Sequence, residues 1–259
     1  MIPLKTEEEL AVMRENGALL ATILEELCKE AVAGQTTGFL NRVAEERIRD
    51  CGSEPAFPKF AGFPGAINAS LNDEVVHGVP SDDRRLRDGD LLSIDIGLVR
   101  RGFCADMATT IVVGEVEVAP ELRRLLEIGE RSLWKGIGQV RIGNRLSDVS
   151  HAVGSFVEEE GFHVVREYVG HGIGRALHED PQIPNYGPPG RGVRLRPGMT
   201  LAIEPMVKTD ALPTRVKDDR WTVVTGSGGP SVHFEHTVAL TEDGVEVLTC
   251  KEVSPGARG

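Results

Sequence analysis

Apolar residues recur along this chain with helical spacing in some stretches and with strand-like density in others. The stretch Thr6–Ala33 has a helical period, begins with a threonine that can cap a helix, and is followed by Gly34, so it predicts a long first helix. Thr36–Cys51 has the same period and predicts a second, amphipathic helix. Asp90–Gly97 and Phe103–Val113 are instead rich in β-branched and apolar residues, and we expect two strands joined by a hairpin turn.

The second part of the chain repeats this order of helices followed by strands. One helix is predicted to start at Pro120 and another to cover Leu146–Glu160. Gly52–Pro64 breaks the periodic pattern, and the Pro- and Gly-rich run Pro181–Gly198 is typical of a long surface loop. This order predicts an α+β protein in which helices cover one face of a mainly antiparallel sheet. Further strands are expected near His163–Tyr168, Thr200–Val207, Trp221–Thr225 and Val232–Leu240.

An internal repeat with an offset of 109 residues indicates two similar halves. Leu86–Asp95 and Leu195–Glu204 share five of ten residues, and each segment ends in a carboxylate. The same offset carries Gly34 onto Gly143. Several anchors at one offset favour a duplicated half-fold over chance matches. We therefore expect one catalytic domain over residues 1–259, with internal repeats at roughly 6–113 and 118–250.

Composition and charge narrow the functional classes. The chain has 259 residues, 40% of them hydrophobic, which is enough for a substantial core. Its net charge of −11 argues against a direct nucleic-acid function. None of the four cysteines forms a C-x-x-C pair, nothing resembles a secretory signal, and no apolar run reaches the length of a membrane span. These features predict a cytoplasmic location without membrane contact.

Carboxylates occur at unfavourable places in three separate apolar strands. Asp95 lies within LLSIDIG, Glu204 ends TLAIEP, and Glu235 lies within VHFEHTVAL. An ionised carboxylate inside such a strand is costly unless it binds something, so a generic fold with scattered buried acids is energetically poor. Asp106, on the partner strand of the predicted hairpin, adds a second acid close to Asp95, and two facing carboxylates need a cation or a shared proton.

Histidines in the glycine-rich run GHGIGRALHEDP complete a set of metal ligands. Four carboxylates and one imidazole can hold two divalent ions, and oxygen-rich ligation favours Mn, Fe, Co or Zn in a two-metal hydrolase. Bridged between the ions, a water would lose a proton and act as the nucleophile, while the metals polarise the scissile carbonyl. The residues by themselves therefore predict a metallohydrolase.

Five motifs follow one another along the chain: NDEVVHG (72–78), IDIG and GFCADMATT (94–110), GHGIGRALHEDP (170–181), PGMTLAIEP (197–205) and FEHTVAL (234–240). In their order and spacing the chain resembles the methionine aminopeptidase family from about residue 1 to residue 250. The resemblance implies the pita-bread fold, a pseudo-twofold α+β structure, and removal of the initiator methionine from nascent proteins with a small second residue. It also implies two bound divalent metal ions.

The resemblance also implies a role for each candidate residue. Asp106 and Glu235 would be the bridging carboxylates. Glu204 would serve additionally as general base for the bridging water. His178 would hydrogen-bond the substrate carbonyl, and His77 would contact the backbone of the second substrate residue. The five implied metal ligands are Asp95, Asp106, His171, Glu204 and Glu235.

The methionine pocket is transferred from the same resemblance. Its walls would be apolar or aromatic, as a thioether side chain requires, with His77 at the edge. Several bacterial members have tyrosines in place of Phe60 and Phe63, many have cysteine in place of Asn68, and phenylalanine is frequent in place of Leu177. These departures concern the shape of the pocket and leave the reaction unchanged. The implied wall residues are Phe60, Phe63, Leu177 and Trp221.

Subtype and partners follow from the same comparison. Only 31 positions separate Glu204 from Glu235, which leaves no room for the helical insertion of type II enzymes, and no N-terminal zinc-binding extension is present. The chain thus resembles the minimal bacterial type I form. The implied partners are the N-termini of nascent polypeptides, with the ribosome as a candidate partner and a monomer as the expected state. Candidate ribosome contacts are the arginine clusters Arg84, Arg85, Arg87 and Arg100, Arg101, which are also typical of solvated turns.

Two other functions stay open at this point. Proline-specific peptidases share the fold, but they usually carry a sizeable domain before the catalytic half, and only 94 residues precede Asp95 here. A non-catalytic binding module on the same fold would have lost ligands, whereas all five ligand positions are present. Dependence of activity on metal separates the second alternative from an enzyme.

Overall fold

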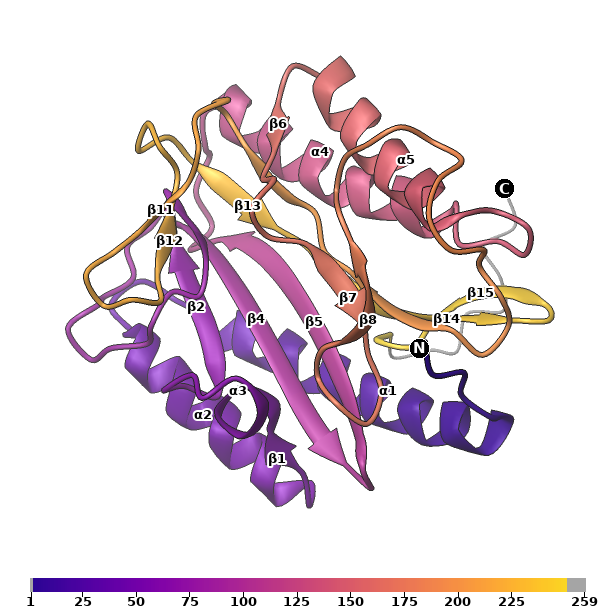
Figure 1. The fold of residues 1–259 in the computed structure, drawn as a ribbon. Helices are drawn as coiled ribbons and strands as arrows, with labels where there is room; N and C mark the ends of the chain where they lie inside the picture. The colour runs from indigo at the N-terminus through magenta and orange to yellow at the C-terminus, as the bar shows by residue number, and fades with distance from the viewer. Residues whose placement is uncertain (1, 251–259) are drawn as a thin grey trace.

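The computed structural model describes residues 2–250. Within this part of the chain, two pairs of long helices alternate with runs of strands, as Figure 1 shows. The helices are α1 Glu7–Glu30, α2 Thr37–Asp50, α3 Ala56–Phe60, α4 Pro120–Ile137 and α5 Leu146–Glu159. The strands are β1 Glu54–Pro55, β2 Ile67–Leu71, β3 Glu74–Val76, β4 Leu91–Arg100, β5 Phe103–Val112, β6 His163–Val164, β7 Gly170–Gly172, β8 Glu179–Ile183, β9 Thr200–Ile203, β10 Met206–Lys208, β11 Arg215–Val216, β12 Val223–Val224, β13 Ser231–His233, β14 Glu235–Thr241 and β15 Gly244–Val247.

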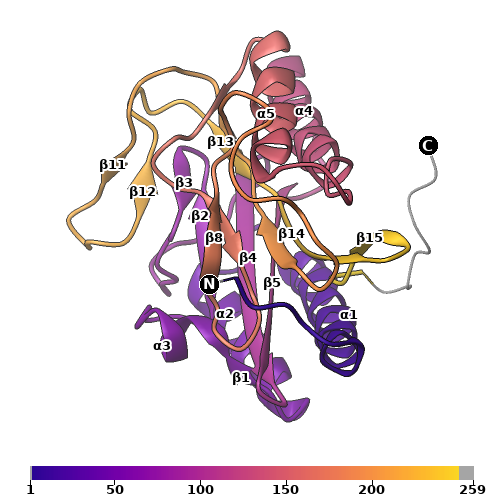
Figure 2. The same cartoon turned by 45° about the vertical axis from the view of Figure 1, so that its right-hand side comes forward.

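A nine-stranded antiparallel sheet forms the centre of the molecule. Its strands follow the order β1-β4-β5-β14-β9-β7-β8, with β2 added to β4 and β15 added to β14. Two three-stranded sheets, β13-β10-β6 and β11-β12-β3, complete the strand set of the described residues. Figures 1 and 2 show α1 and α2 grouped beside the long β4–β5 hairpin and α4 and α5 grouped at the other end of the sheet. The predicted α+β class with helices on a mainly antiparallel sheet is confirmed.

The helices start and pack as the hydrophobic pattern dictates. Thr6 and Glu9 form a capping box at the start of α1, because each side chain accepts a hydrogen bond from the other residue's backbone N–H. The buried face of α1 and the buried face of α2 join β4 and β5 in one apolar core, in which Leu20 and Leu40 are fully enclosed. A second core lies between α4, α5 and the strands of the second half. Each pair of helices therefore covers its own half of the sheet.

The 109-residue offset recurs in the backbone. Helix α2 begins at residue 37 and α5 at residue 146, and the bridges Thr36–Arg85 and Arg145–Arg194 close equivalent loops. Gly34 and Gly143 precede these helices with φ of 92° and 95°, a left-handed conformation that glycine adopts without strain. Equivalent loops with equivalent backbone angles give the two halves the pseudo-twofold relation predicted for the fold.

Two predicted strands are each divided in the structure. The stretch predicted as Thr200–Val207 breaks at Glu204 into β9 and β10, and the stretch predicted as Val232–Leu240 breaks at Phe234 into β13 and β14. In both cases the chain leaves one sheet and enters another. Pro205 supports the first break because proline has no backbone N–H to donate to a ladder. Both breaks lie beside a carboxylate of the predicted site.

Other local expectations were less complete. The irregular stretch predicted over Gly52–Pro64 contains β1 and α3, and the strand expected near His163–Tyr168 is regular over only two residues. Strands β2 and β3 were not predicted, since their few apolar residues are surrounded by turn-forming ones. No helix among residues 2–250 is long and apolar enough to cross a membrane.

Candidate active site

Strand register brings carboxylates from three strands into one row across the sheet. Asp95 on β4 lies opposite Ala108 on β5, and Ala108 lies opposite Glu235 on β14. Asn68 on β2 extends the row, because it pairs with Asp95 and donates a 2.5 Å hydrogen bond from Nδ2 to Asp95 Oδ2. Asp106 is two residues from Ala108 on the same strand, so its side chain points to the same face of the sheet. The register thus collects three acids on one face.

Glu204 and His171 reach this row from the second half of the protein. His171 lies on β7, and its Nδ1 is 2.9 Å from the carbonyl oxygen of Gly172, which turns Nε2 toward the acids. That Nε2 lies 3.4 Å from Glu204 Oε1 and 3.9 Å from Asp106 Oδ2. One ligand atom each from Asp106, His171 and Glu235 all lie within 4.8 Å of one another. Such spacing is suited to a metal ion.

The cluster lacks internal partners for its buried oxygens. Asp106 and Glu235 are only 4% and 2% exposed. Among the described residues, Asp95 Oδ1, Asp106 Oδ1 and Glu235 Oε1 are buried without a hydrogen-bond partner. Buried polar atoms are almost always paired, so these oxygens require a cation or protons. A divalent cation fits this donor set, because hard oxygen ligands and one imidazole suit Mn, Fe, Co and Zn.

Burial and mutual repulsion shift the ionisation of every acid in the cluster. Burial raises the pKa of Asp95 to about 6 and the pKa of Glu204 to about 8. Burial, followed by repulsion from neighbouring carboxylates, raises the pKa of Asp106 and of Glu235 well above the usual range. Burial lowers the pKa of His171 to about 3, so its imidazole is neutral and free to ligate a metal. The protein thus holds together acids that favour protonation in the absence of a cation.

A cavity of about 150 Å³ adjoins the acid cluster. One side of it is polar and contains the carboxylates and histidines. The other side is apolar, and there Phe63 packs edge-on against Trp221 with ring centroids 5.3 Å apart. The residues that line the cavity are Phe57, Ala61, Phe63, Asn68, His77, Asp95, Asp106, His171, Leu177, His178, Glu204, Trp221 and Glu235.

Phe60 is the candidate residue that the structure does not bring to this cavity. Its side chain is 39% exposed, and the ammonium of Lys59 lies 5.9 Å from its ring centroid. Phe57 and Ala61 line the cavity from the same helix, α3, and its immediate end. Since the sequence predicted no helix here, the direction of each side chain could not be worked out in advance.

His178 and His77 lie outside the strands. Contacts of Glu179 fix the loop before His178, and His77 has an unusual backbone conformation. The loop before His178 closes on Glu179, which accepts hydrogen bonds from two backbone N–H groups and pairs with the ammonium of Lys5 at 2.5 Å. The His178 ring then lies edge-on to His171 at 4.4 Å. His77 has a φ of 58°, an unfavourable value for a non-glycine residue, and burial lowers its pKa to about 4. Strain of this kind is often retained at functional sites.

His233 is a neighbour of the site that the sequence did not assign to it. Its side chain is 2% exposed, and its Nε2 lies 3.6 Å from Glu204 Oε2. The sequence offered one indication, since His233 lies two residues before Glu235. In a continuous strand, residues two apart point to the same face of the sheet. Because the strand breaks at Phe234, this signal could not decide the matter.

Four of the five arginines considered as ribosome contacts make contacts within the protein through their side chains. The Arg84 guanidinium pairs with Glu74, and Arg100 and Arg101 both pair with Glu15. Arg85 donates to the carbonyl oxygen of Gly34. Arg85, Arg87 and Arg101 are nevertheless exposed, as expected for solvated turns, and a contact with the ribosome stays a prediction.

Comparisons with known proteins place this geometry in context. The profile of metallopeptidase family M24 matches residues 11–242. Methionine aminopeptidase 1 of Bacillus subtilis is 49% identical over 249 residues, covering 96% of this chain and 99% of the relative. The crystal structure of methionine aminopeptidase from Thermotoga maritima superposes with a TM-score of 0.93 at 44% identity, covering 96% of this chain and 100% of that one. Prolidase from Pyrococcus furiosus shares the fold with a TM-score of 0.75 at 24% identity, and the match covers 96% of this chain and 66% of that longer chain.

Proposed function

Since the chain belongs to metallopeptidase family M24 and, within it, to the methionine aminopeptidases, we propose that the acid cluster and the adjoining cavity are its active site. It is a metal-dependent aminopeptidase that removes methionine from protein N-termini. We further propose the minimal type I form, a preference for a small second residue, and a single catalytic domain over residues 1–259, whose ends lie outside the described residues. The proposed setting is the cytoplasm, where a monomer acts on nascent chains at the ribosome.

Two divalent ions would be held by the five predicted ligands. The proposal is supported by the unpartnered oxygens of Asp95, Asp106 and Glu235, by the neutral imidazole of His171, and by the short distances among their ligand atoms. Asp106 and Glu235 would bridge the ions. When bound, the metals supply Lewis acidity, which polarises a peptide carbonyl and lowers the pKa of a water.

The remaining polar residues have roles that follow from their ionisation and position. Glu204 would accept the proton of the attacking water and pass it to the leaving amine, because its carboxylate lines the cavity 3.4 Å from His171 Nε2, beside the other predicted ligands. Burial lowers the pKa of His178, so a neutral imidazole would donate a hydrogen bond to the substrate carbonyl as negative charge develops there. His77, also neutral, would contact the backbone of the second substrate residue.

The apolar side of the cavity would take the methionine side chain. The cavity as a whole measures about 150 Å³, below the ~300 Å³ at which pockets for drug-sized ligands start, so its apolar side can take only a single side chain. Phe63, Leu177 and Trp221 supply the aromatic and aliphatic surface that a thioether prefers. Phe60 would contribute only at the outer edge, given its exposure.

The observation that carries the proposal is the row of buried, unpartnered carboxylate oxygens on one side of a cavity whose other side is apolar. Its test is peptide hydrolysis after chelation and re-addition of Mn or Co, with Met-Ala-Ser, Met-Ile-Ser, Leu-Ala-Ser and Ala-Pro-Ser as substrates. We expect metal-restored release of methionine from Met-Ala-Ser and little reaction with the other three peptides.

The control is the double variant Asp106→Asn, Glu235→Gln, which should stay inactive with every metal. Cleavage of Ala-Pro-Ser in preference to Met-Ala-Ser would transfer the chain to the proline-specific branch. Activity that survives exhaustive chelation would remove the metal site from the mechanism.

A further inference from the structure

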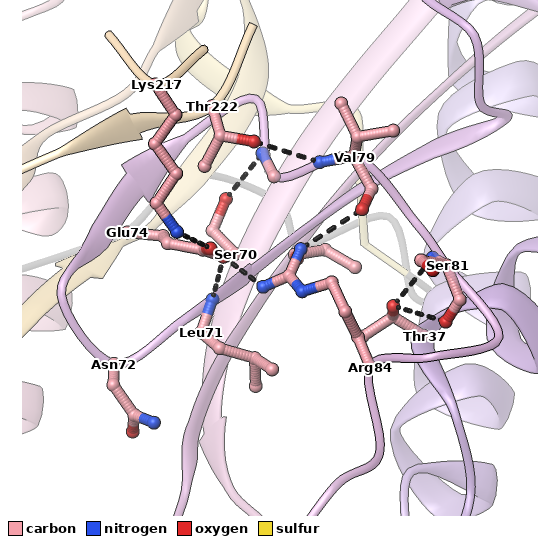
Figure 3. A network of polar contacts seen from close by, with 12 residues as sticks. Thr37, Ser70, Leu71, Asn72, Glu74, Val79, Ser81, Arg84, Lys217 and Thr222 are labelled. Carbon is pink, nitrogen blue, oxygen red and sulfur yellow. Dashed lines mark hydrogen bonds and ion pairs between the residues drawn. The ribbon is translucent and has the colours of Figure 1, made fainter. Parts of the chain in front are cut away.

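A buried carboxylate outside the active site is paired with two cations. Glu74, the first residue of β3, is 5% exposed. Its Oε1 accepts a 2.7 Å hydrogen bond from Lys217 Nζ, and its Oε2 accepts hydrogen bonds from the Arg84 guanidinium and, at 2.8 Å, from the backbone N–H of Leu71. Figure 3 shows Lys217 and Arg84 approaching the carboxylate from different sides. Arg84 alone can neutralise Glu74, so Lys217 is an additional charge that neutralisation does not require.

The Lys217–Glu74 pair joins two segments that both lead into the substrate cavity. Strand β3 runs from Glu74 directly into His77, which lines the cavity. The turn that starts at Lys217 runs into Trp221, which lines the same cavity and packs against Phe63. Strands β3 and β12 pair beside this ion pair through Val76 and Val223. The ion pair therefore lies at the base of two cavity-lining segments.

The turn itself is rigid, so its attachment point sets the position of Trp221. The backbone N–H of Lys217 donates to the carbonyl oxygen of Thr222 at 2.8 Å. Both Trp221 and Thr222 donate their backbone N–H groups to Asp219 Oδ1, at 2.9 and 2.8 Å. The Thr222 hydroxyl lies 3.4 Å from the carbonyl oxygen of His77. A shift of Lys217 would thus be transmitted to both Trp221 and the backbone of His77.

Core burial anchors the end of this turn, where Val223 is fully buried and pairs with β3, but contributes little at its start. Strand β11 is exposed at both residues, and the side chains of Leu212 and Val216 are 53% and 56% exposed. A segment with so little buried apolar surface is expected to have low local stability. The polar attachment to β3 must supply what packing does not.

We propose that Lys217 is a positioning residue for the substrate: its ion pair with Glu74 holds the turn 217–222 against β3 and thereby sets the affinity of the methionine pocket, without taking part in the chemical step. The inference rests on the proposed function for the meaning of the pocket. The position of Trp221, in contrast, can be observed in the protein without substrate or metal.

Lys217→Met is the informative variant, because Lys217 is 46% exposed and Arg84 still pairs with the carboxylate, so the fold should persist. We expect KM for Met-Ala-Ser to rise about fivefold with kcat within about twofold, a factor that corresponds to about 1 kcal/mol of ion-pair energy. Lys217→Arg should restore most of the affinity. Lys29→Met is the matched control, since it removes the same charge from an exposed pair with Glu25 on α1.

Trp221 provides a readout that is independent of activity. The chain has two tryptophans, so a Trp134→Phe background leaves Trp221 as the one fluorophore of this kind. In that background, Lys217→Met should shift the Trp221 emission to longer wavelength and increase its quenching by acrylamide. About 0.5 M NaCl should cause the same shift and the same increase in quenching in the Trp134→Phe protein that keeps Lys217, since salt screens a partly exposed ion pair. In the Lys217→Met variant the salt should have little further effect.

An unchanged Trp221 emission together with an unchanged KM in Lys217→Met would overturn the proposal. A lower kcat and a lower melting temperature together with the higher KM would also overturn it, since that pattern indicates a general structural role. If no variant cleaves methionyl peptides, the proposed function fails, and the fluorescence comparison still decides whether Lys217 positions Trp221.

Discussion

The polar and apolar sides of the cavity are held in place by different kinds of structure. On the polar side, Asp95, Asp106 and Glu235 lie on paired strands of the central sheet, and their relative positions follow from ladder register. On the apolar side, Trp221 and Leu177 lie on loops, and the turn around Trp221 is tied down by side-chain hydrogen bonds and by the Lys217–Glu74 ion pair. The strand-borne acids are fixed by the sheet ladder, whereas the position of the loop-borne wall depends on a few side-chain contacts.

The two sides of the cavity need different positional accuracy. Two metal ions require ligand atoms fixed to within fractions of an ångström, and a sheet provides that accuracy. A pocket for one flexible thioether tolerates small shifts, so loops suffice there. We therefore expect substitutions on the sheet to affect kcat and metal binding, and substitutions on the loops to affect KM.

The largest effect is expected for Glu235→Gln. Losing a charged ligand from the sheet should lower kcat/KM by ~10³-fold or more, which corresponds to about 4 kcal/mol of transition-state stabilisation. The metal-free variant should nevertheless melt at a higher temperature than the metal-free parent, because a buried, repelled carboxylate is removed. Steady-state kinetics and thermal unfolding of the metal-free proteins check the two parts. A metal-free variant that melts below its parent would contradict the account of the acid cluster.

His178→Ala should have the next largest effect and tests the border between the two sides. Its ring lies on a loop but lines the cavity beside His171. Loss of one donor to a developing oxyanion typically lowers kcat by about 10²–10³-fold. We expect that loss in kcat with KM changed by less than about threefold. A change confined to KM would assign His178 to substrate binding alone.

Phe63→Ala sharpens the comparison on the apolar side. Phe63 is 3% exposed and packs on Trp221, so its loss should raise KM for methionyl peptides by about tenfold and leave kcat within about threefold. Phe60→Ala removes an equal ring from outside the cavity and should raise KM less. Equal effects of the two substitutions would show that the wall extends to Phe60.

The smallest expected effect is a pH dependence of the metal-free protein. Burial raises the pKa of Glu204 from an ordinary value of 4.5 to about 8. Between these values the folded protein binds more protons than the unfolded chain, so its stability falls as pH rises through this window. Melting temperatures of the metal-free protein from about pH 5 to 8 should decline more steeply than those of Glu204→Gln, which cannot ionise. Parallel profiles for the two proteins would contradict the raised pKa.

Much of the site could be predicted because its residues leave strong local signals. Asp95, Glu204 and Glu235 are recognisable as acids within apolar strands, and α2 and α5 as helices with a shared period. Such signals depend on the burial cost of a charge and on helical periodicity, both of which are local properties. Phe60 was predicted to line the cavity, but Phe57 and Ala61 line it instead. Side-chain direction on the short helix α3 depends on how the helix packs against the rest of the protein.

The sequence by itself determined the residue types of the acid cluster, the order of the elements and the duplication of the half-fold. Tertiary structure decided the register that lines up Asp95, Ala108 and Glu235, the breaks of the chain at Glu204 and Phe234, and the pairing of Lys217 with Glu74 across 143 residues. Periodicity and burial cost are properties of neighbouring residues. Register, sheet crossing and long-range ion pairs are set only when distant strands meet, because no local energy term distinguishes one partner from another until both are packed.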